Sequence, residues 1–284
     1  MPRRRAPRAL GGTPGDRRRP GDREDGGLGG EHVEGRRAVR ELLAAGRRSV
    51  AEVVVAEGQD PSALLDDVVA LAAASRVPVR MATAIELRAT ARTEAPQGVV
   101  ARAAPVEAVG LDDLVAANPD HGPARTPAGD VPFIVVVAEV TDPHNLGAIL
   151  RSALGAGVTG VVLARHRTAH LTPTAMKAAA GAVEHLSIAL VPGIGPALET
   201  LSSRGVWTVG LDPEGETPLD SLEIATEPLA MVIGAEGRGL APLVKRRCDV
   251  RCRIPLYGPV GSLNVSVATA VALFGIASRR HKDG

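Results

Sequence analysis

The stretch RIPLYGPVGSLNVSVATAVALF, residues 253–274, carries the clearest structural signal in the chain. Residues 250–256 have the length and flanks of a buried strand, which breaks at glycines and a proline that turn a chain sharply. A Ser-Leu-Asn segment then leads into apolar positions at helical spacing, and Ser or Asn directly before such a run is a helix N-cap signal. The pattern predicts a strand, a glycine loop and a capped helix. An ordinary strand–turn–helix unit without a site would give the same pattern.

From residue 131 onward, apolar runs of strand length alternate with patterns of helical period. The expected strands cover residues 133–137, 160–164, 188–191, 206–211 and 229–233, and the expected helices residues 145–156, 174–185, 195–203 and 241–245. This alternation is typical of a mostly parallel sheet that is covered on both faces, with ligands at the carboxyl ends of its strands. We therefore predict an α/β domain over residues 131–284.

The amino-terminal part divides into three segments. Residues 1–28 hold eight arginines against four acidic residues and almost nothing apolar, which predicts a disordered basic tail. Residues 29–104 show a shorter α/β alternation, enough for one small domain, and the proline- and glycine-rich residues that follow predict a linker over 105–130. The first expected helix of the small domain is basic, which fits either a solvated face or a surface that faces RNA. Its arginines are Arg36, Arg37, Arg40, Arg47 and Arg48.

The composition is that of a two-domain globular protein, with 284 residues, 45% hydrophobic residues and a formal net charge of +1. Only three of the 33 basic residues are lysines, so the cationic groups are mainly guanidinium forks, which suit phosphates and base edges. No apolar run approaches the roughly 20 residues of a membrane helix, and nothing resembles a signal peptide, so we expect a cytoplasmic protein without a membrane partner. Cys248 and Cys252 have no second ligand pair, so we expect small buried side chains.

Polar residues follow the first strand of the expected large sheet. In DPHNLGAILR, residues 142–151, Asn145 or the aspartate can cap the helix. Arg151 lies about 120° round the helix from Asn145, so the two side chains can share a rim without stacking. An arginine among apolar helix residues is usually structural, as an ion-paired or snorkelling side chain.

Two further polar clusters lie at later strand ends. In IGAEGRGL, residues 233–240, three glycines surround Glu236 and allow a ligand to approach the backbone. The segment lacks the Lys-Ser/Thr ending of a P-loop, and its place in the domain does not fit a dinucleotide fingerprint. The third cluster is the loop that holds Ser262 and Asn264.

The three segments, in this order within one α/β domain, closely resemble the three motifs of the SpoU-type 2′-O-ribose RNA methyltransferases. The resemblance covers about residues 131–280. HVEGRRAV, residues 32–39, and QGVVA, residues 97–101, are similar to the ends of the L30e-like substrate domain in the branch that methylates a guanosine in the peptidyl-transferase P loop of 23S rRNA. The resemblance implies a trefoil-knotted parallel-sheet domain that binds S-adenosylmethionine (SAM), preceded by a small L30e-like α/β domain.

The resemblance also assigns residues to the cofactor and to the reaction. The SAM pocket is expected to involve Gly210, Leu211, Gly234, Ile254, Leu256 and Leu263. Arg151 matches the family's catalytic arginine, and because arginine stays protonated we expect it to stabilise the developing alkoxide. The resemblance implies that Asn145 and Asn264 orient the ribose and the loops, that Ser262 holds the substrate side, and that Glu236 pairs with Arg151.

The resemblance implies two partners and no metal ion. The partners are 23S rRNA, or its precursor particle, and a second copy of the chain. The family's dimers complete the active site across their interface, and the apolar helix over residues 265–276 would supply such a surface, although a core helix would look the same.

Two departures bear on the exact nucleotide. Pro96 stands where relatives usually have histidine, and the KAAAG segment at residues 177–181 has alanine where serine is common. The alternatives are the same chemistry on tRNA or at an rRNA site that confers antibiotic resistance, and a non-catalytic RNA-binding assembly factor. A nicotinamide-dependent dehydrogenase fits poorly, because no GxGxxG follows the first strand of the large domain.

Overall fold

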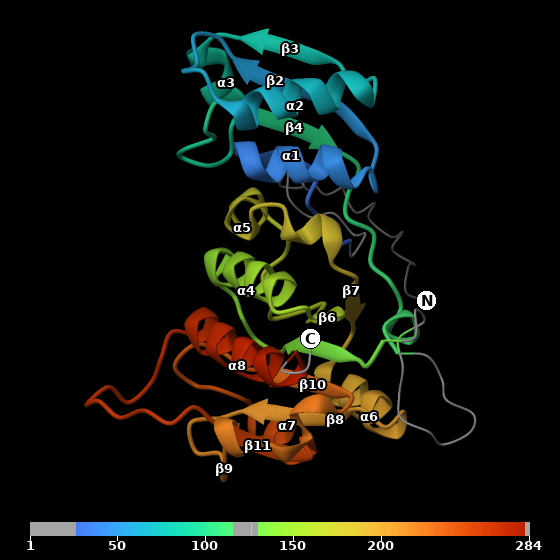
Figure 1. Cartoon of the computed structure of the whole chain (residues 1–284), viewed down its shortest axis with the longest axis vertical. Helices are drawn as coiled ribbons and strands as arrows, with labels where there is room; N and C mark the ends of the chain where they lie inside the picture. The colour runs from blue at the N-terminus through green and yellow to red at the C-terminus, as the bar shows by residue number, and fades with distance from the viewer. Residues whose placement is uncertain (1–26, 116–125, 127–129, 282–284) are drawn as a thin grey trace, which may run out of the picture.

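The computed structural model describes residues 27–115, 126 and 130–281. Two β-sheets with their helices are stacked along the long axis of the molecule (Figure 1). The expected basic tail lies outside the described residues up to residue 26. Leu28, at its end, is buried, and its carbonyl accepts a hydrogen bond from Leu171 N. The end of the predicted tail therefore belongs to the packed structure.

The carboxy-terminal sheet has the strand order β7-β6-β5-β10-β8-β11-β9, and all of its pairings are parallel. The strands are β5 (Phe133–Val137), β6 (Gly160–Ala164), β7 (Ile188–Val191), β8 (Trp207–Leu211), β9 (Thr217–Pro218), β10 (Leu229–Ile233) and β11 (Val250–Arg253). Every residue of β5, β6 and β10 is buried, as in the central strands of a parallel sheet that is covered on both faces. The predicted α/β class is confirmed, and the trefoil knot stays a prediction from the resemblance.

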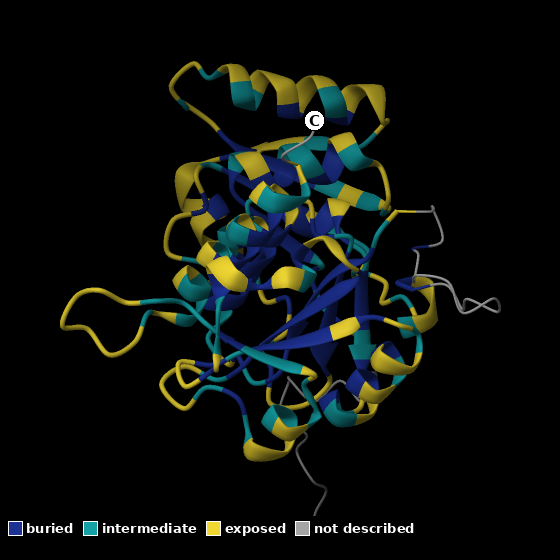
Figure 2. Ribbon diagram, turned by 60° about the horizontal axis from the view of Figure 1, so that its bottom comes forward, coloured by how far each residue is buried: buried dark blue, intermediate teal, exposed yellow. Residues whose placement is uncertain are grey.

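Helices cover both faces of this sheet, with the buried strands between them (Figure 2). Alternate residues of β5 enter two separate cores, one shared with α4, α5 and α8 and the other with α6 and α7. The helices are α4 (Pro143–Gly155), α5 (Pro173–Ala179), α6 (Ile194–Ser203), α7 (Pro242–Arg247) and α8 (Val265–Arg280), with short 3-10 helices η3 (Leu219–Ser221) and η4 (Glu223–Thr226) before β10.

The helix expected over residues 174–185 is broken into α5 and the 3-10 helix η2 (Ala182–His185). Ala180 and Gly181 between them have left-handed backbones, with φ of 50° and 90°. A Cβ atom on Gly181 would lie 2.4 Å from Cβ of Glu41, so the break allows the amino-terminal domain to approach closely. Helical periodicity alone did not reveal this contact.

The amino-terminal sheet has the order β1-β4-β2-β3, in which β4 is antiparallel to both neighbours and β2 and β3 are parallel. Its strands are β1 (His32–Glu34), β2 (Val50–Ala56), β3 (Val79–Ala82) and β4 (Val99–Ala103), and its helices are α1 (Arg36–Ala45), α2 (Ala63–Ala74) and α3 (Ala84–Thr90). α3 begins with a capping box in which Thr83 and Glu86 bond each other's backbone N–H groups.

The first part of the expected linker packs against the carboxy-terminal sheet. Val109 N donates to Ile188 O at 2.9 Å, and the 3-10 helix η1 (Leu111–Asp113) follows. Leu114 and Val115 are then buried in the core that contains α6. Apolar side chains at these positions hold this part of the segment on the sheet; residues 116–125 and 127–129 lie outside the described chain.

Arg280, at the end of α8, ties the last helix to the first strand of its domain. Its guanidinium lies 4.6 Å from the centre of the Phe133 ring, and its Nε donates to Ala225 O at 2.8 Å. Burial lowers the pKa of Arg280 to about 10, so the side chain remains a cation at neutral pH. This contact links the two ends of the carboxy-terminal domain.

The two domains are joined by a buried ion pair. Arg48 Nε donates to Glu184 Oε2 at 2.9 Å, and the side chains of Arg48 and Glu184 are only 7% and 2% exposed. Arg48 Nη1 also donates to the carbonyls of Gly30 and Ala104, at 3.0 and 2.6 Å. His185 Nε2 lies 2.9 Å from Glu41 Oε2 at the edge of the same interface. The amino-terminal domain is therefore docked on α5 and η2.

Both cysteines are expected to react slowly with thiol reagents in the folded protein. Burial raises the pKa of Cys248 and of Cys252 to about 12, so almost no thiolate is present at pH 8. Titration with a chromogenic disulfide reagent at pH 8 should detect two thiols rapidly in denaturant and react slowly without it. Fast reaction of the native protein would show that these side chains are accessible.

Candidate active site

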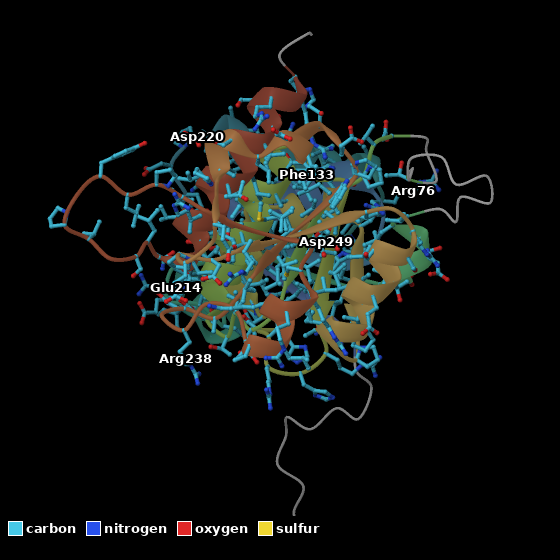
Figure 3. The ribbon with its side chains drawn as sticks, turned by 90° about the horizontal axis from the view of Figure 1, so that it is seen from below. Arg76, Phe133, Glu214, Asp220, Arg238 and Asp249 are labelled. Atoms are coloured by element: carbon cyan, nitrogen blue, oxygen red, sulfur yellow. The ribbon has the colours of Figure 1, made fainter. Side chains whose placement is uncertain are left out.

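A pocket lies at the carboxyl ends of β8, β10 and β11, and we call it the cofactor pocket. Figure 3 views the molecule from below and labels Glu214 and Arg238, on the loops that follow β8 and β10. The apolar walls of the pocket come from Leu211, Ile233, Ile254, Leu256, Leu263 and Val265. Residues 256–262, between β11 and α8, form an exposed loop that extends from the body (Figure 2).

Five of the six expected cofactor residues line this pocket: Leu211, Gly234, Ile254, Leu256 and Leu263. Gly210 is not among the lining residues. A Cβ atom on Gly210 would lie 2.8 Å from Leu240 Cδ1 and 3.1 Å from Cys248 Sγ, so this side of the strand faces α7. Because β8 runs between β10 and β11, Gly210 supports the pocket from within the sheet.

The residues that line the pocket suit the chemistry of SAM. Aliphatic side chains can cover the faces of a planar adenine, and turning backbone segments can read its edge. At Gly234 the two sides of the loop approach so closely that a Cβ atom would lie 2.2 Å from Gly239 O. Ala235 and Gly239 form an antiparallel bridge that closes this loop.

Replacing Gly234 with alanine is expected to weaken SAM binding by about 10- to 100-fold. The added methyl group forces the backbone of residues 239–240 to move, which distorts the loop beside the pocket, and overpacking of this kind costs about 1–3 kcal/mol. Isothermal titration with SAM measures this effect. Gly258→Ala is the matched control, since a Cβ atom there meets nothing within 4 Å. Equal SAM affinities of the two variants would contradict the role of the close approach.

Asp212 is a pocket residue that the sequence analysis missed. It directly follows β8, lines the cofactor pocket and is 1% exposed. Lys245 Nζ lies 2.9 Å from its Oδ2, and Glu214 N donates to its Oδ1 at 3.1 Å. The charge is thus paired, and the carboxylate shapes the loop that forms one wall. A carboxylate immediately after a buried strand was the signal that could have identified it.

Three of the expected catalytic residues form one hydrogen-bonded triangle. Asn145 Nδ2 donates to Glu236 Oε2, and Asn264 Nδ2 donates to both Asn145 Oδ1 and Glu236 Oε1, each at 3.1 Å. Asn264 Oδ1 accepts from Ser266 N at 2.9 Å and so caps α8. The triangle joins the beginnings of α4 and α8 to the loop after β10, so all three sequence clusters meet here.

The expected pairing of Glu236 with Arg151 does not occur. Both carboxylate oxygens of Glu236 accept hydrogen bonds from asparagine amides instead. Asn264 Nδ2 donates both of its hydrogens within the triangle, so in this arrangement the side chain orients the loops. It has no amide hydrogen left to donate to a ribose. Ser262 is exposed and lines the cofactor pocket.

Arg151 lies in a different place, on the exposed side of α4. It lines the interdomain hollow, a cavity between the two domains whose basic residues are Arg36, Arg37, Arg92, His144, Arg151 and Lys177. Arg151 is not among the residues that line the cofactor pocket of its own chain. Within the described residues it forms no hydrogen bond or ion pair, so its guanidinium is available to a ligand.

Four apolar side chains are exposed on α4 and α8 beside Arg151. Leu154, Val267, Val271 and Phe274 are 37%, 49%, 44% and 51% exposed, and we call them the apolar patch. Phe274 reaches α4, since its Cζ would lie 3.3 Å from a Cβ atom on Gly155. On α4, Arg151 lies one helical turn before Leu154, and both line the same cavity.

Two other features concern partners. No helix in the described part of the chain is long and apolar enough to cross a membrane. Among the same residues, no three His, Cys, Asp or Glu side chains are grouped so that they could hold a metal ion.

The comparisons with known proteins agree with this geometry. Residues 132–274 match the model of the SpoU rRNA Methylase family, and residues 32–109 match that of the RNA 2′-O ribose methyltransferase substrate-binding domain. The 23S rRNA (guanosine-2′-O-)-methyltransferase RlmB of Pseudomonas putida is 39% identical over 88% of this chain and 97% of its own length.

Solved structures show the same fold with cofactor. The AdoMet-bound rRNA methyltransferase of Sinorhizobium meliloti is 25% identical with a TM-score of 0.67, covering 88% of this chain and 87% of that one. The SpoU methyltransferase AviRb of Streptomyces viridochromogenes, in complex with AdoMet, has a TM-score of 0.71 at 23% identity, over 88% of this chain and 90% of that one, and shows the fold alone. The chain belongs to the SpoU family of SAM-dependent RNA methyltransferases.

Proposed function

We propose that this protein transfers a methyl group to the ribose 2′-hydroxyl of a guanosine in 23S rRNA, in the peptidyl-transferase P loop. The observation that carries the proposal is the similarity to an RlmB over nearly the whole of both chains, together with intact polar residues from all three motifs beside the cofactor pocket. A relative named a 23S rRNA (guanosine-2′-O-)-methyltransferase supports the substrate class.

The chemistry requires help at the 2′-hydroxyl. SAM, when bound, supplies a methyl group on a sulfonium. The hydroxyl is a very weak acid and must lose its proton as the new bond forms. No histidine or lysine is among the residues that line the cofactor pocket. A guanidinium is a poor proton acceptor, so the role of Arg151 is to stabilise the developing alkoxide, and the proton passes to a substrate phosphate or to water.

The position of Arg151 favours a homodimer. Its guanidinium faces the interdomain hollow, while the cofactor pocket of the same chain is lined by other residues. A second copy that covers the apolar patch would bury exposed leucine, valine and phenylalanine side chains. α8 carries part of this patch and also lines the cofactor pocket through Val265 and Ala268. The interface would thus bring the cofactor pocket of one chain to Arg151 of the other.

The division of labour follows from the two matched regions. We propose that residues 29–104 bind the RNA substrate and that residues 131–284 form the methyltransferase domain, joined by residues 105–130. The cytoplasm is the proposed compartment, because bacterial rRNA is made and assembled there.

Methyl transfer from labelled SAM to protein-free 23S rRNA, mapped by reverse-transcription stops at 2′-O-methylated positions, tests the proposal. The expected result is one stop at the P-loop guanosine. A stop elsewhere in rRNA, or label in tRNA, would keep the chemistry and replace the substrate. SAM binding without transfer to rRNA, tRNA or ribosomal subunits would favour a non-catalytic assembly factor.

A further inference from the structure

Three arginines line the interdomain hollow without a side-chain partner among the described residues. Arg37, Arg92 and Arg151 are all exposed, and none forms a hydrogen bond through its side chain or an ion pair with a described residue. They come from both domains: Arg37 from α1, Arg92 from the segment after α3, and Arg151 from α4. Guanidinium groups that converge on one cavity without carboxylate partners are suited to a polyanion.

The walls of the hollow are fixed by other interactions. Glu34, which is fully buried, accepts hydrogen bonds from the backbone N–H groups of Arg92 and Thr93, the latter at 3.2 Å. Lys177 donates to Ala95 O, which joins α5 to the same segment across the two domains. A buried carboxylate and an interdomain hydrogen bond hold the backbone of this segment, so the position of Arg92 in the wall of the hollow is fixed before RNA binds.

Arg36, at the start of α1, holds the end of the same segment. Its Nε donates to Gln97 O at 3.1 Å and its Nη2 to Gln59 Oε1 at 2.8 Å. The next residue, Arg37, also lines the cavity. The hollow is therefore a preformed site that spans both domains, and its lining has five Arg and Lys side chains against the carboxylates of Glu34 and Glu94.

The hollow continues toward the apolar patch and not into the cofactor pocket of the same chain. A second cavity is lined by Arg37 and Arg151 together with Leu154 and Gly155, so it joins the hollow to the edge of the patch. None of the residues that line the hollow also lines the cofactor pocket. RNA held in the hollow would thus reach Arg151 of the same chain and a cofactor pocket across the patch.

We infer that the interdomain hollow binds the RNA backbone beside the target nucleotide through Arg37 and Arg92, so that each chain presents RNA to its own Arg151 and to the cofactor of its partner. The inference rests on the proposed function and on the shared active site of the proposed dimer. It adds a cis rule: the amino-terminal domain and the catalytic arginine that serve one RNA belong to one chain.

The first test replaces Arg37 and Arg92 together with glutamine in the full-length protein. KM for 23S rRNA should rise on the order of tenfold with kcat and SAM affinity unchanged, and the slope of log affinity against log salt concentration should fall by about 0.7 for each lost phosphate contact. Arg76→Gln/Arg88→Gln is the matched control, because both arginines are exposed on the same domain outside the hollow. An unchanged KM and salt slope would overturn the assignment of the hollow.

The second test separates cis from trans with mixed dimers of differently tagged, co-expressed chains. One chain carries Arg151→Ala and the other Gly234→Ala. Only one composite site is then intact: it takes its cofactor pocket from the chain with Arg151→Ala and its arginine from the chain with Gly234→Ala. Adding the two glutamine substitutions to the chain with Arg151→Ala should leave KM for rRNA unchanged. Adding them to the chain with Gly234→Ala should raise KM as in the first test.

If the glutamine substitutions raise KM only on the chain with Arg151→Ala, the cis rule is wrong, and the hollow that binds the RNA belongs to the chain that holds the cofactor.

Failure of the proposed function gives a different result from either KM pattern. If the mixed dimer without glutamine substitutions has no activity beyond that of its parents, the shared active site is wrong, and the cis rule falls with it. The first test still decides whether the hollow binds RNA.

Discussion

Replacing Arg151 with alanine is expected to lower kcat for methyl transfer by about 10²- to 10³-fold, the usual loss when one group that stabilises a developing oxyanion is removed. SAM affinity should change little, because the apolar walls and loops that line the cofactor pocket come from other residues. The fold should also survive, since the side chain is exposed and forms no bond with any described residue. Single-turnover transfer of labelled methyl at saturating rRNA measures the chemical step directly.

Two further variants make this result specific. Arg151→Lys keeps the charge but not the planar fork, so it should recover part of the rate. Arg165→Ala removes another exposed arginine of the same domain, outside the described cavities, and should leave kcat unchanged. An Arg151→Ala protein with a normal single-turnover rate would eliminate the arginine from the reaction.

Replacing Arg48 with methionine is expected to destabilise the docked domains by about 3–5 kcal/mol, because it leaves the Glu184 carboxylate buried without its partner. The change also removes donors to the carbonyls of Gly30 and Ala104. Hydrogen exchange should accelerate in η2 and at the start of β1, where the domains meet. Denaturant unfolding followed by circular dichroism gives the loss of stability.

The double variant Arg48→Met/Glu184→Leu tests the cause. It removes both charges and should recover most of the stability that the single variant loses, because no buried charge is left unpaired. If the double variant is as unstable as the single one, the hydrogen bonds to the two carbonyls, and not the ion pair, hold the domains together. Arg40→Met breaks a partly exposed ion pair on α1, within the same domain as Arg48, and should cost at most about 1 kcal/mol.

The sequence predicted most of what depends on neighbouring residues. The buried strands from β5 onward are continuous apolar runs, and Asn264 caps α8 as its place before an apolar run indicates. Local patterns are sufficient there, because strand burial and helix capping are set within a few residues. The clusters at strand ends were also placed correctly at one edge of the sheet, since parallel strands bring their carboxyl ends together.

Contacts between distant segments could not be predicted in this way. Glu236 was expected to bind Arg151, yet its partners are Asn145 and Asn264, and Arg151 lies in another cavity. The docking of Arg48 on Glu184 depends on two polar residues that each look solvated in the sequence. The break at Ala180 likewise follows from the approach of a separate domain. In each case the deciding partner lies elsewhere in the chain, and no local period reports it.

The contact of Arg280 with Phe133 has a consequence for how the chain acquires its structure. The first strand and the last helix of the carboxy-terminal domain can pack together only after the ribosome has synthesised the residues between them. Until then, the apolar face of the early strands that α8 covers stays exposed to solvent. Domains dominated by such long-range pairings fold slowly, and their folding intermediates expose apolar surface that is prone to aggregate. Nascent chains of this protein should therefore depend on chaperones more than their final stability suggests.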